Sequence, residues 1–405
     1  MHVLIAGAGL GGLTLAQNLR KQGISYEVFE RDESKDSRFQ GWAIAMHTIV
    51  EDLVASVPDD LPDLKQAVDH IRPLNLPTQI CLYPAETNNR VGWEDCAETP
   101  FIRAERYRLR NWLSTNINIQ WNKRIEHIEH NDDGVTVYFQ DNTSAKGDIL
   151  VGADGAHSIV RQQLLNKSND EVLRVIPLAA IVGELTLSGD AFRRQLALSH
   201  GSYSLIDADR GYLTFCSLHK VAPDGQSAQY YWIMSNNDST IADSNHWLRN
   251  ASQQEKLDHV RDIMKDRAPR FREIFELTEA SGVRAETHVW RDLELDSLPA
   301  GRVILMGDAA HVMTPFRGEG GFNTFIDAMN LGKRLTQLNV ENKVDDIAAV
   351  KEQVIEYNTE MLERGCKSVR LSRQWVDGTK VKQKQPLQAP MKVIPFKDLP
   401  TELVA

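Results

Sequence analysis

The sequence predicts an α/β protein in which a parallel sheet with flanking helices is joined to a mostly antiparallel β-sheet. Three short apolar runs, at residues 3–6, 149–152 and 303–306, each end in a turn of small residues, as buried parallel strands beside a ligand do. Between about residues 175 and 295, apolar and polar residues alternate instead, which is typical of antiparallel strands. Residues 345–375 have a helical pattern.

These patterns predict a discontinuous organisation. We expect a first domain formed by residues 1–75, 100–172 and 296–340, a second domain formed by 76–99 and 173–295, and C-terminal helices with a loosely packed arm at 341–405. A chain of 405 residues is long enough for two such domains.

The composition indicates a globular protein of the cytoplasm. Its net charge of -10 argues against a nucleic-acid partner, because no overall basic field attracts phosphate. We find no run of about 18 apolar residues, so we expect no membrane span. The four cysteines lie far apart without a Cys/His cluster, and we expect reduced, buried thiols and no metal site.

The first apolar run opens a G-x-G-x-x-G pattern with Gly7, Gly9 and Gly12. The first glycine makes a tight turn, the second lets a pyrophosphate approach the backbone, and the third lets the following helix pack on the strand. The next strand ends at Glu30, which is placed to accept hydrogen bonds from a ribose. Together these features predict a Rossmann-type dinucleotide site, although they do not distinguish FAD from NAD.

Further elements follow along the chain. We expect helices over 48–75, 101–113, 252–267 and 269–277, and a small antiparallel insertion between about 117 and 139. The 101–113 helix carries four arginines. Arg103, at its start, is a candidate for contacting a phosphate or ribityl oxygen. We interpret Arg106, Arg108 and Arg110 as a solvated basic face.

The second and third apolar runs lead into Asp154-Gly155 and Gly307-Asp308. Ligands of a doubly wound sheet bind beyond the carboxyl ends of its strands. If the three strand ends lie side by side, both aspartates approach the same ligand, although either one alone is commonly a turn or cap residue.

The three motifs, in this order, resemble those of the class A FAD-dependent monooxygenases, also called aromatic hydroxylases. The chain matches their G-x-G-x-x-G with Glu30-Arg31, their D-G motif at 152–158 with Arg161, and their G-D motif at 307–311 with Pro315 and residues 318–323. The run 40–44 resembles a fungal and microbial biosynthetic branch. The resemblance implies a glutathione-reductase-like FAD-binding domain that carries an inserted substrate domain.

The resemblance also implies the cofactor contacts. Glu30 would hold the adenosine ribose, Arg103 the pyrophosphate and ribityl region, and Asp308 the ribityl chain. Asp154 would support the nucleotide site, mostly indirectly, and a helix beginning near Gly320 would direct its N–H groups at the flavin pyrimidine. The cofactor-binding set implied in this way is Gly7, Gly9, Gly12, Glu30, Arg31, Gly41, Arg103, Ile125, Asp154, Asp308, Pro315, Gly320, Gly321 and Asn323.

The activity implied by the resemblance is monooxygenation. NADPH or NADH would reduce FAD as a transient electron donor, and one atom of O2 would enter an aromatic or polyketide- or alkaloid-like small molecule, by hydroxylation or epoxidation, in secondary metabolism. The protein would act as a monomer or homodimer. Tyr203, Tyr212 and His47 are candidates for substrate contact and catalysis, each with an ordinary structural role as the alternative.

Other functions remain open. A reductase or dehydrogenase acting on an isoprenoid-like substrate would share these motifs, as would a non-catalytic flavin-binding protein. A disulfide oxidoreductase would need a redox cysteine pair soon after the first motif, and a flavin halogenase would need a W-x-W-x-I-P sequence. Neither pattern occurs.

Overall fold

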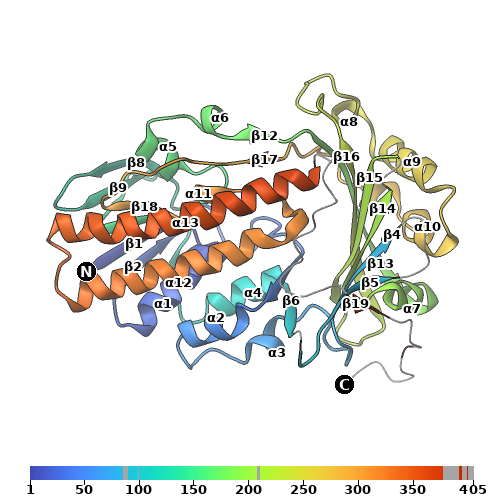
Figure 1. The fold of residues 1–405 in the computed structure, drawn as a ribbon, viewed down its shortest axis with the longest axis horizontal. Coiled ribbons are helices and arrows are strands. Elements are labelled where there is room, and N and C mark those ends of the chain that lie inside the picture. Colours follow the sequence, from blue (N-terminus) through green and yellow to red (C-terminus); the bar gives the residue numbers. More distant parts are fainter. Residues whose placement is uncertain (85–89, 99, 208–209, 377–391, 395–398, 400–405) are drawn as a thin grey trace. The chain divides into compact units, whose positions relative to one another are not determined.

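The computed structural model describes residues 1–84, 90–98, 100–207, 210–376, 392–394 and 399 (Figure 1). The chain forms two compact units, which we describe separately. Unit 1 comprises Met1–Ala67, Arg106–Arg174 and Arg291–Arg373, and unit 2 comprises Val68–Glu105, Val175–Trp290 and Gln374–Ala405. Compared with the expected boundaries, residues 68–75 and 100–105 belong to unit 2, and the helical segment up to Arg373 belongs to unit 1. Most of the expected C-terminal arm lies outside the described residues.

A five-stranded parallel sheet forms the centre of unit 1. Its order is β18 (Val303–Leu305), β11 (Ile149–Gly152), β1 (His2–Ala6), β2 (Ser25–Phe29) and β7 (Ile119–Gln120). In register, Ala6 lies opposite Gly152, which in turn lies opposite Leu305. The three motif-bearing strands are therefore adjacent and end at the same edge, as the sequence predicts.

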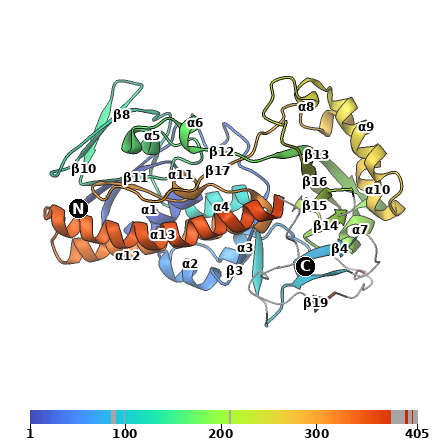
Figure 2. The same ribbon diagram turned by 45° about the horizontal axis from the view of Figure 1, so that its top comes forward.

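Helices cover this sheet, and the two longest run side by side (Figures 1 and 2). They are α1 (Leu10–Lys21), α2 (Val50–Ser56), α4 (Arg106–Leu113), α5 (Ile159–Leu165), α6 (Asn169–Val172), α11 (Asp308–His311), α12 (Glu319–Val340) and α13 (Ile347–Val376). The smaller elements are β3 (Ala43–His47), β17 (Arg291–Asp292), the 3-10 turn η2 (Pro315–Arg317) and a sheet of β8 (Ile125–His130), β9 (Val135–Phe139) and β10 (Ser144–Gly147). Glycines at the contacts let α1 pack closely on the strands.

The expectation of a helix over 101–113 is wrong in its first part. Phe101–Glu105 forms the strand β6, and the helix α4 begins only at Arg106. Every residue of β6 is buried, including two charged ones, so its arginine and glutamate are held by contacts that local sequence does not reveal. The expected helix over 48–75 is also reduced, to α2 and the short α3 (Leu64–Val68).

Unit 2 is built on a seven-stranded, mostly antiparallel sheet. Its order is β13 (Leu178–Ser188), β16 (Ser227–Asn237), β15 (Tyr212–Val221), β14 (Ser202–Asp207), β4 (Gln79–Pro84), β5 (Val91–Glu94) and β19 (Lys392–Val393). The other elements are β12 (Arg174–Val175), which spans the unit boundary, and α7 (Gly189–Leu198), α8 (Trp247–Asn250), α9 (Gln253–Met264), α10 (Pro269–Glu276) and η1 (Ala280–Gly282).

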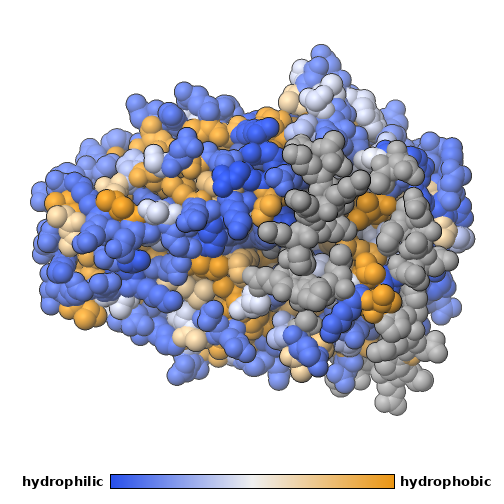
Figure 3. Space-filling view, in the orientation of Figure 1, coloured by the Kyte–Doolittle hydropathy of each residue, from blue (hydrophilic) through white to orange (hydrophobic). Residues whose placement is uncertain are grey.

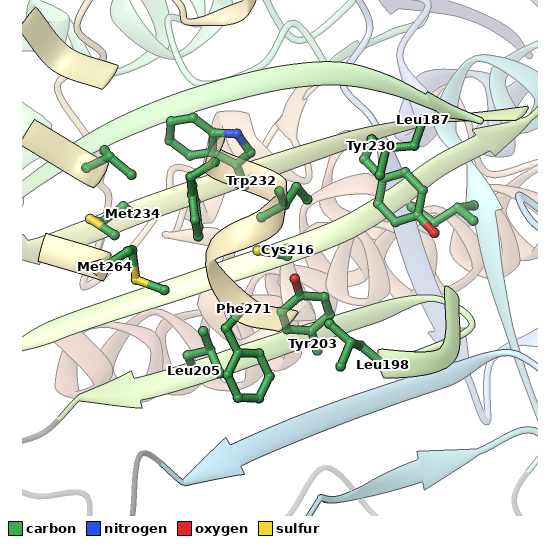
Figure 4. Packing of buried hydrophobic residues seen from close by; sticks show 14 of the residues in the cluster. Leu187, Leu198, Tyr203, Leu205, Cys216, Tyr230, Trp232, Met234, Met264 and Phe271 are labelled. Atoms are coloured by element: carbon green, nitrogen blue, oxygen red, sulfur yellow. The ribbon is translucent and has the colours of Figure 1, made fainter. Parts of the chain in front are cut away.

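One face of this sheet packs against α7, α9 and α10 to form the core of unit 2 (Figure 4). Trp232 is fully buried there and its indole Nε1 donates to Thr278 Oγ1 at 3.0 Å. Because side chains alternate along a strand, the neighbouring residues point to the opposite face. On β15 and β16 that second face carries Phe215 and Tyr231, whose rings are 5.8 Å apart.

Among the described residues, no helix is long and apolar enough to cross a membrane. The face over which α12 and α13 run is largely hydrophilic, with scattered apolar residues (Figure 3). The four cysteines all lie among the described residues and form no disulfide; three of them are buried, whereas Cys96 is partly exposed.

Candidate cofactor site

The glycine turn after β1 is closed on its inner side and open at Gly9. Gly7 has a φ of +107°, and a Cβ there would lie 2.4 Å from the Ala153 carbonyl oxygen. A Cβ on Gly12 would lie 2.0 Å from the Gly7 carbonyl oxygen, whereas one on Gly9 would meet nothing within 4 Å. Helix α1 then begins with neither a side-chain cap nor an acidic residue in its first turn. Its first N–H groups and the open space at Gly9 therefore fit a pyrophosphate.

Glu30, directly after β2, is buried and holds this turn in place. Its Oε2 accepts from the Ala8 N–H at 2.9 Å and its Oε1 from the Asp32 N–H at 3.1 Å. A carboxylate has about four lone-pair sites, so it retains capacity for a hydroxyl donor such as a ribose.

Arg110 also braces the glycine turn. It lies on α4, its Nε donates to the Ala8 carbonyl at 2.8 Å, and its Nη2 lies 3.7 Å from Glu30 Oε2. Interpreting Arg110 as part of a solvated face is therefore wrong, because its side chain is buried. The signal that could have revealed this is spacing, because Arg110 lies three residues before the apolar Leu113 and next to Leu109, both of which are buried in α4.

The second turn is stabilised by Asp154 and Arg161. Asp154 accepts from Ser158 Oγ at 2.5 Å and from the N–H groups of Ile159 and Val160 at 2.8 and 3.2 Å, so its carboxylate caps α5. Burial raises the pKa of Asp154, against the effect of these hydrogen bonds. Arg161 donates to the Ala309 carbonyl at 2.9 Å and thereby ties the second turn to the third.

The third turn presents Asp308 to solvent, although its neighbours Gly307 and Ala309 are buried. Arg106, the first residue of α4, interacts electrostatically with it. Solvent reaches the Arg106 side chain, yet protein atoms crowd it, and this burial lowers the pKa of its guanidinium while the charge of Asp308 opposes the shift. A Cβ on Gly41, whose φ is +95°, would lie 3.1 Å from Arg106 Cδ. Arg106 thus lies against Gly41 and interacts electrostatically with Asp308, which the sequence interpretation missed.

The start of α12 forms another side of the site. The helix follows Gly318, which has a φ of +67°, and has no side-chain cap. Its first-turn Glu319 is paired with Arg317 at 2.7 Å. A Cβ on Gly321 would lie 1.9 Å from Ile44 Cδ1, so β3 packs directly against the helix start. Pro315 is exposed just before it.

His47, at the end of β3, is partly exposed. Burial lowers the pKa of His47, and the charge of Glu319 opposes this effect. Because its pKa is lowered, the imidazole of His47 is neutral near pH 7. His47 belongs to the same unit as the glycine turn and α12.

Asn323 has a different environment from the expected one. Its side-chain amide donates to the Glu319 carbonyl at 2.9 Å and to Ser368 Oγ at 3.1 Å, and its Oδ1 accepts from Arg364 Nη1 at 2.7 Å. The side chain thus joins α12 to α13, and only the backbone of this residue is left for a cofactor.

The two candidate tyrosines lie on the helix-covered face of the unit 2 sheet. Tyr203 is buried, its ring lies beside Phe271 of α10 (Figure 4), and its hydroxyl donates to Gln195 Oε1 at 2.9 Å. These contacts favour the structural role that was the alternative for Tyr203. Tyr212 is partly buried and packs against the same core. The sequence shows that these strands alternate but not which face is covered, and the residues of the second face were missed for that reason.

The remaining predicted residues are dispersed. Arg31 is exposed on the loop after β2. Ile125 begins β8 with its side chain buried, which leaves only its backbone for a contact. Arg103 belongs to unit 2, where its Nη2 donates to the Tyr231 hydroxyl at 2.7 Å.

Three strand ends meeting at one edge of a parallel sheet, beside two uncapped helix starts, define a dinucleotide-binding protein. The FAD binding domain family matches residues 1–348. The chain is 74% identical over 405 residues, all of both chains, to the FAD-dependent monooxygenase thnD of Trichoderma harzianum. It is 31% identical to the FAD-dependent monooxygenase cctM of Talaromyces islandicus, covering 92% of this chain and 91% of that one.

Among solved structures, 2,6-dihydroxypyridine-3-hydroxylase from Arthrobacter nicotinovorans has a TM-score of 0.71 at 17% identity, covering 99% of each chain, which supports the fold. The chain belongs to the FAD-dependent monooxygenase family and groups with fungal members. The predicted family, fold class, enzyme class and FAD cofactor are thereby confirmed.

Proposed function

We propose that this monooxygenase uses NADPH or NADH to insert one oxygen atom of O2 into an aromatic or polyketide- or alkaloid-like small molecule, by hydroxylation or epoxidation, in secondary metabolism. The observation that carries the proposal is the alignment of the three strand ends beside the open Gly9. Bound FAD would supply the redox chemistry and the activation of O2.

The residues of unit 1 would hold and polarise the cofactor. Gly7, Gly9 and Gly12 shape the turn for the pyrophosphate, and Glu30 accepts from the ribose. We assign the phosphate or ribityl contact to Arg106 rather than Arg103, because Arg106 lies beside Asp308 in the same unit. Further proposed contacts come from the loop and backbone positions Arg31, Gly41, Ile125, Pro315, Gly320 and Gly321.

The start of α12 would stabilise negative charge on the pyrimidine side of the reduced cofactor. Its uncapped N–H groups lie at the positive end of a 22-residue helix, and Glu319 is neutralised by Arg317. A neutral His47 beside this helix can accept a proton from a substrate hydroxyl, which makes an aromatic ring more electron-rich.

The test is consumption of NADPH and NADH by the FAD-loaded enzyme with a panel of phenols and enolisable polyketides, in air and under nitrogen. We expect substrate-stimulated turnover that requires O2 and a product that carries one oxygen atom from labelled O2. Turnover under nitrogen with a reduced product would instead support the isoprenoid-type reductase, and incorporation of oxygen from water would contradict the proposal.

A further inference from the structure

Arg103 is a buried cation without a carboxylate partner among the described residues. It is 3% exposed, its Nη2 donates to the Tyr231 hydroxyl at 2.7 Å, and its buried Nε has no hydrogen-bond partner. The Arg103 Cζ also lies over the Phe215 ring, 6.0 Å from the ring centroid. A buried guanidinium is costly unless an anion compensates it.

The nearest acid on the same strand is engaged elsewhere. Glu105 points to the same side of β6 as Arg103, two residues away, and its Oε1 lies 3.2 Å from His219 Nε2. The charge of Arg103 also acts on the neighbouring His70. Burial and, to a smaller extent, the charge of Arg103 lower the pKa of His70 to about 4, and Asp69 opposes both effects. A neutral His70 adds no second positive charge, so the Arg103 guanidinium is the cation available to an anion at this position.

The surroundings of Arg103 are suited to an aromatic ring. Phe215 and Tyr231 lie on the second face of the unit 2 sheet, together with Leu213 and Ile233. Phe215 and Leu213 are only partly buried, whereas Cys216 and Leu218 on the opposite face of the same strand are fully buried. An apolar, partly open surface next to one unpaired guanidinium matches a planar molecule with an ionised oxygen.

We propose that Arg103 is a specificity-determining residue that binds an ionised oxygen of the organic substrate, a carboxylate, phenolate or enolate on an aromatic ring system. Its Nε and Nη groups donate to this oxygen, and Phe215 and Tyr231 contact the ring. This inference rests on the proposed function, since it assigns the substrate class of that enzyme. A guanidinium would also bind a phosphate of FAD, so the test distinguishes an anionic substrate from the cofactor phosphate as the partner of Arg103.

The experiment uses calorimetric titration of the FAD-loaded protein with benzoate and with benzamide, which has the same shape but no charge. No NAD(P)H or turnover is needed, so the result is independent of the redox proposal. We expect benzoate to bind about tenfold or more tightly than benzamide. In Arg103→Gln this preference should disappear, and in Arg103→Lys it should be partly retained.

Two further readouts distinguish a substrate residue from a structural or cofactor residue. The melting temperature of Arg103→Gln should equal or exceed that of the natural protein, because the substitution removes an uncompensated buried charge. Its affinity for FAD should be unchanged. Equal binding of the two probes by the natural protein, including none by either, would overturn the proposal. A lower melting temperature would show a structural arginine, and loss of FAD affinity with the benzoate preference intact would assign Arg103 to the cofactor phosphate.

Discussion

At the scale of single residues, the glycine turn shows how much chemistry a spacing can predict. Gly7, Gly9 and Gly12 have the three different environments that the pattern implies, two closed and one open. The arginines between residues 103 and 110 are the opposite case, because their spacing did not predict their environments. Arg110 was misjudged because its burial depends on Ala8 and Glu30, which are distant in sequence and come close to it only in the folded chain.

Replacing Gly9 by alanine should separate cofactor binding from folding. Its φ of -79° and ψ of -176° suit alanine and its Cβ would meet nothing, so FAD-free Gly9→Ala should unfold within about 1 kcal/mol of the natural protein. The added methyl group would occupy the space proposed for the pyrophosphate and weaken FAD binding about tenfold or more. Denaturant unfolding and flavin fluorescence titration measure the two effects.

Gly12→Ala is the matched comparison. Its Cβ would lie 2.0 Å from the Gly7 carbonyl, so we expect a loss of about 2 kcal/mol or more in the unfolding free energy of the FAD-free protein. Equal stability of the two variants, or natural FAD affinity in Gly9→Ala, would contradict this description of the turn.

At the scale of elements, α11, α12 and α13 are joined by a buried charged network. Asp327 Oδ2 accepts from the Gly307 N–H at 2.8 Å and lies 2.7 Å from His311 Nε2, while Oδ1 accepts from Arg364 Nη2 at 2.7 Å. This network fixes the turn that presents Asp308. The ion pairs of this network could not be predicted from the sequence, because Asp327 and Arg364 lie on other helices than His311 and no local pattern determines how these helices are rotated toward it.

The network should make stability depend on pH. Burial alone would lower the pKa of His311, but the charge and hydrogen bond of Asp327 outweigh it and raise the pKa above 6.5. The stabilisation from His311 is therefore fully present below pH 6.5 and is lost as the pH rises through the folded-state value. The pKa of Asp327 is lowered in spite of burial, mainly by His311, so its contribution is lost only as the pH falls through that lowered value.

We expect the unfolding free energy of the FAD-saturated protein to fall on the alkaline side by at most about 1.4 kcal/mol per pH unit from this proton. His311→Gln should lack this slope, whereas His127→Gln, at an exposed position, should retain it. Denaturant titrations across the pH range provide the measurement. An unchanged slope in His311→Gln would show that another group causes the dependence.

At the scale of the whole molecule, the sequence predicted the α/β class, the edge at which the parallel strands end and the inserted antiparallel sheet, because each has a short-range periodicity. It did not predict that β6 is a buried strand or which face of the unit 2 sheet is covered. Both depend on contacts between distant segments, as Tyr203 and Arg103 illustrate.

The central claim is that unit 1 provides the FAD contacts through Arg106 and Asp308, whereas Arg103 serves the substrate. The most direct measurement is the FAD dissociation constant of Arg106→Gln and Arg103→Gln, each compared with the natural protein. We predict that Arg106→Gln binds FAD about tenfold or more weakly, because a charge-assisted contact is lost, and that Arg103→Gln binds it with natural affinity. Natural affinity in Arg106→Gln together with a loss in Arg103→Gln would contradict the claim.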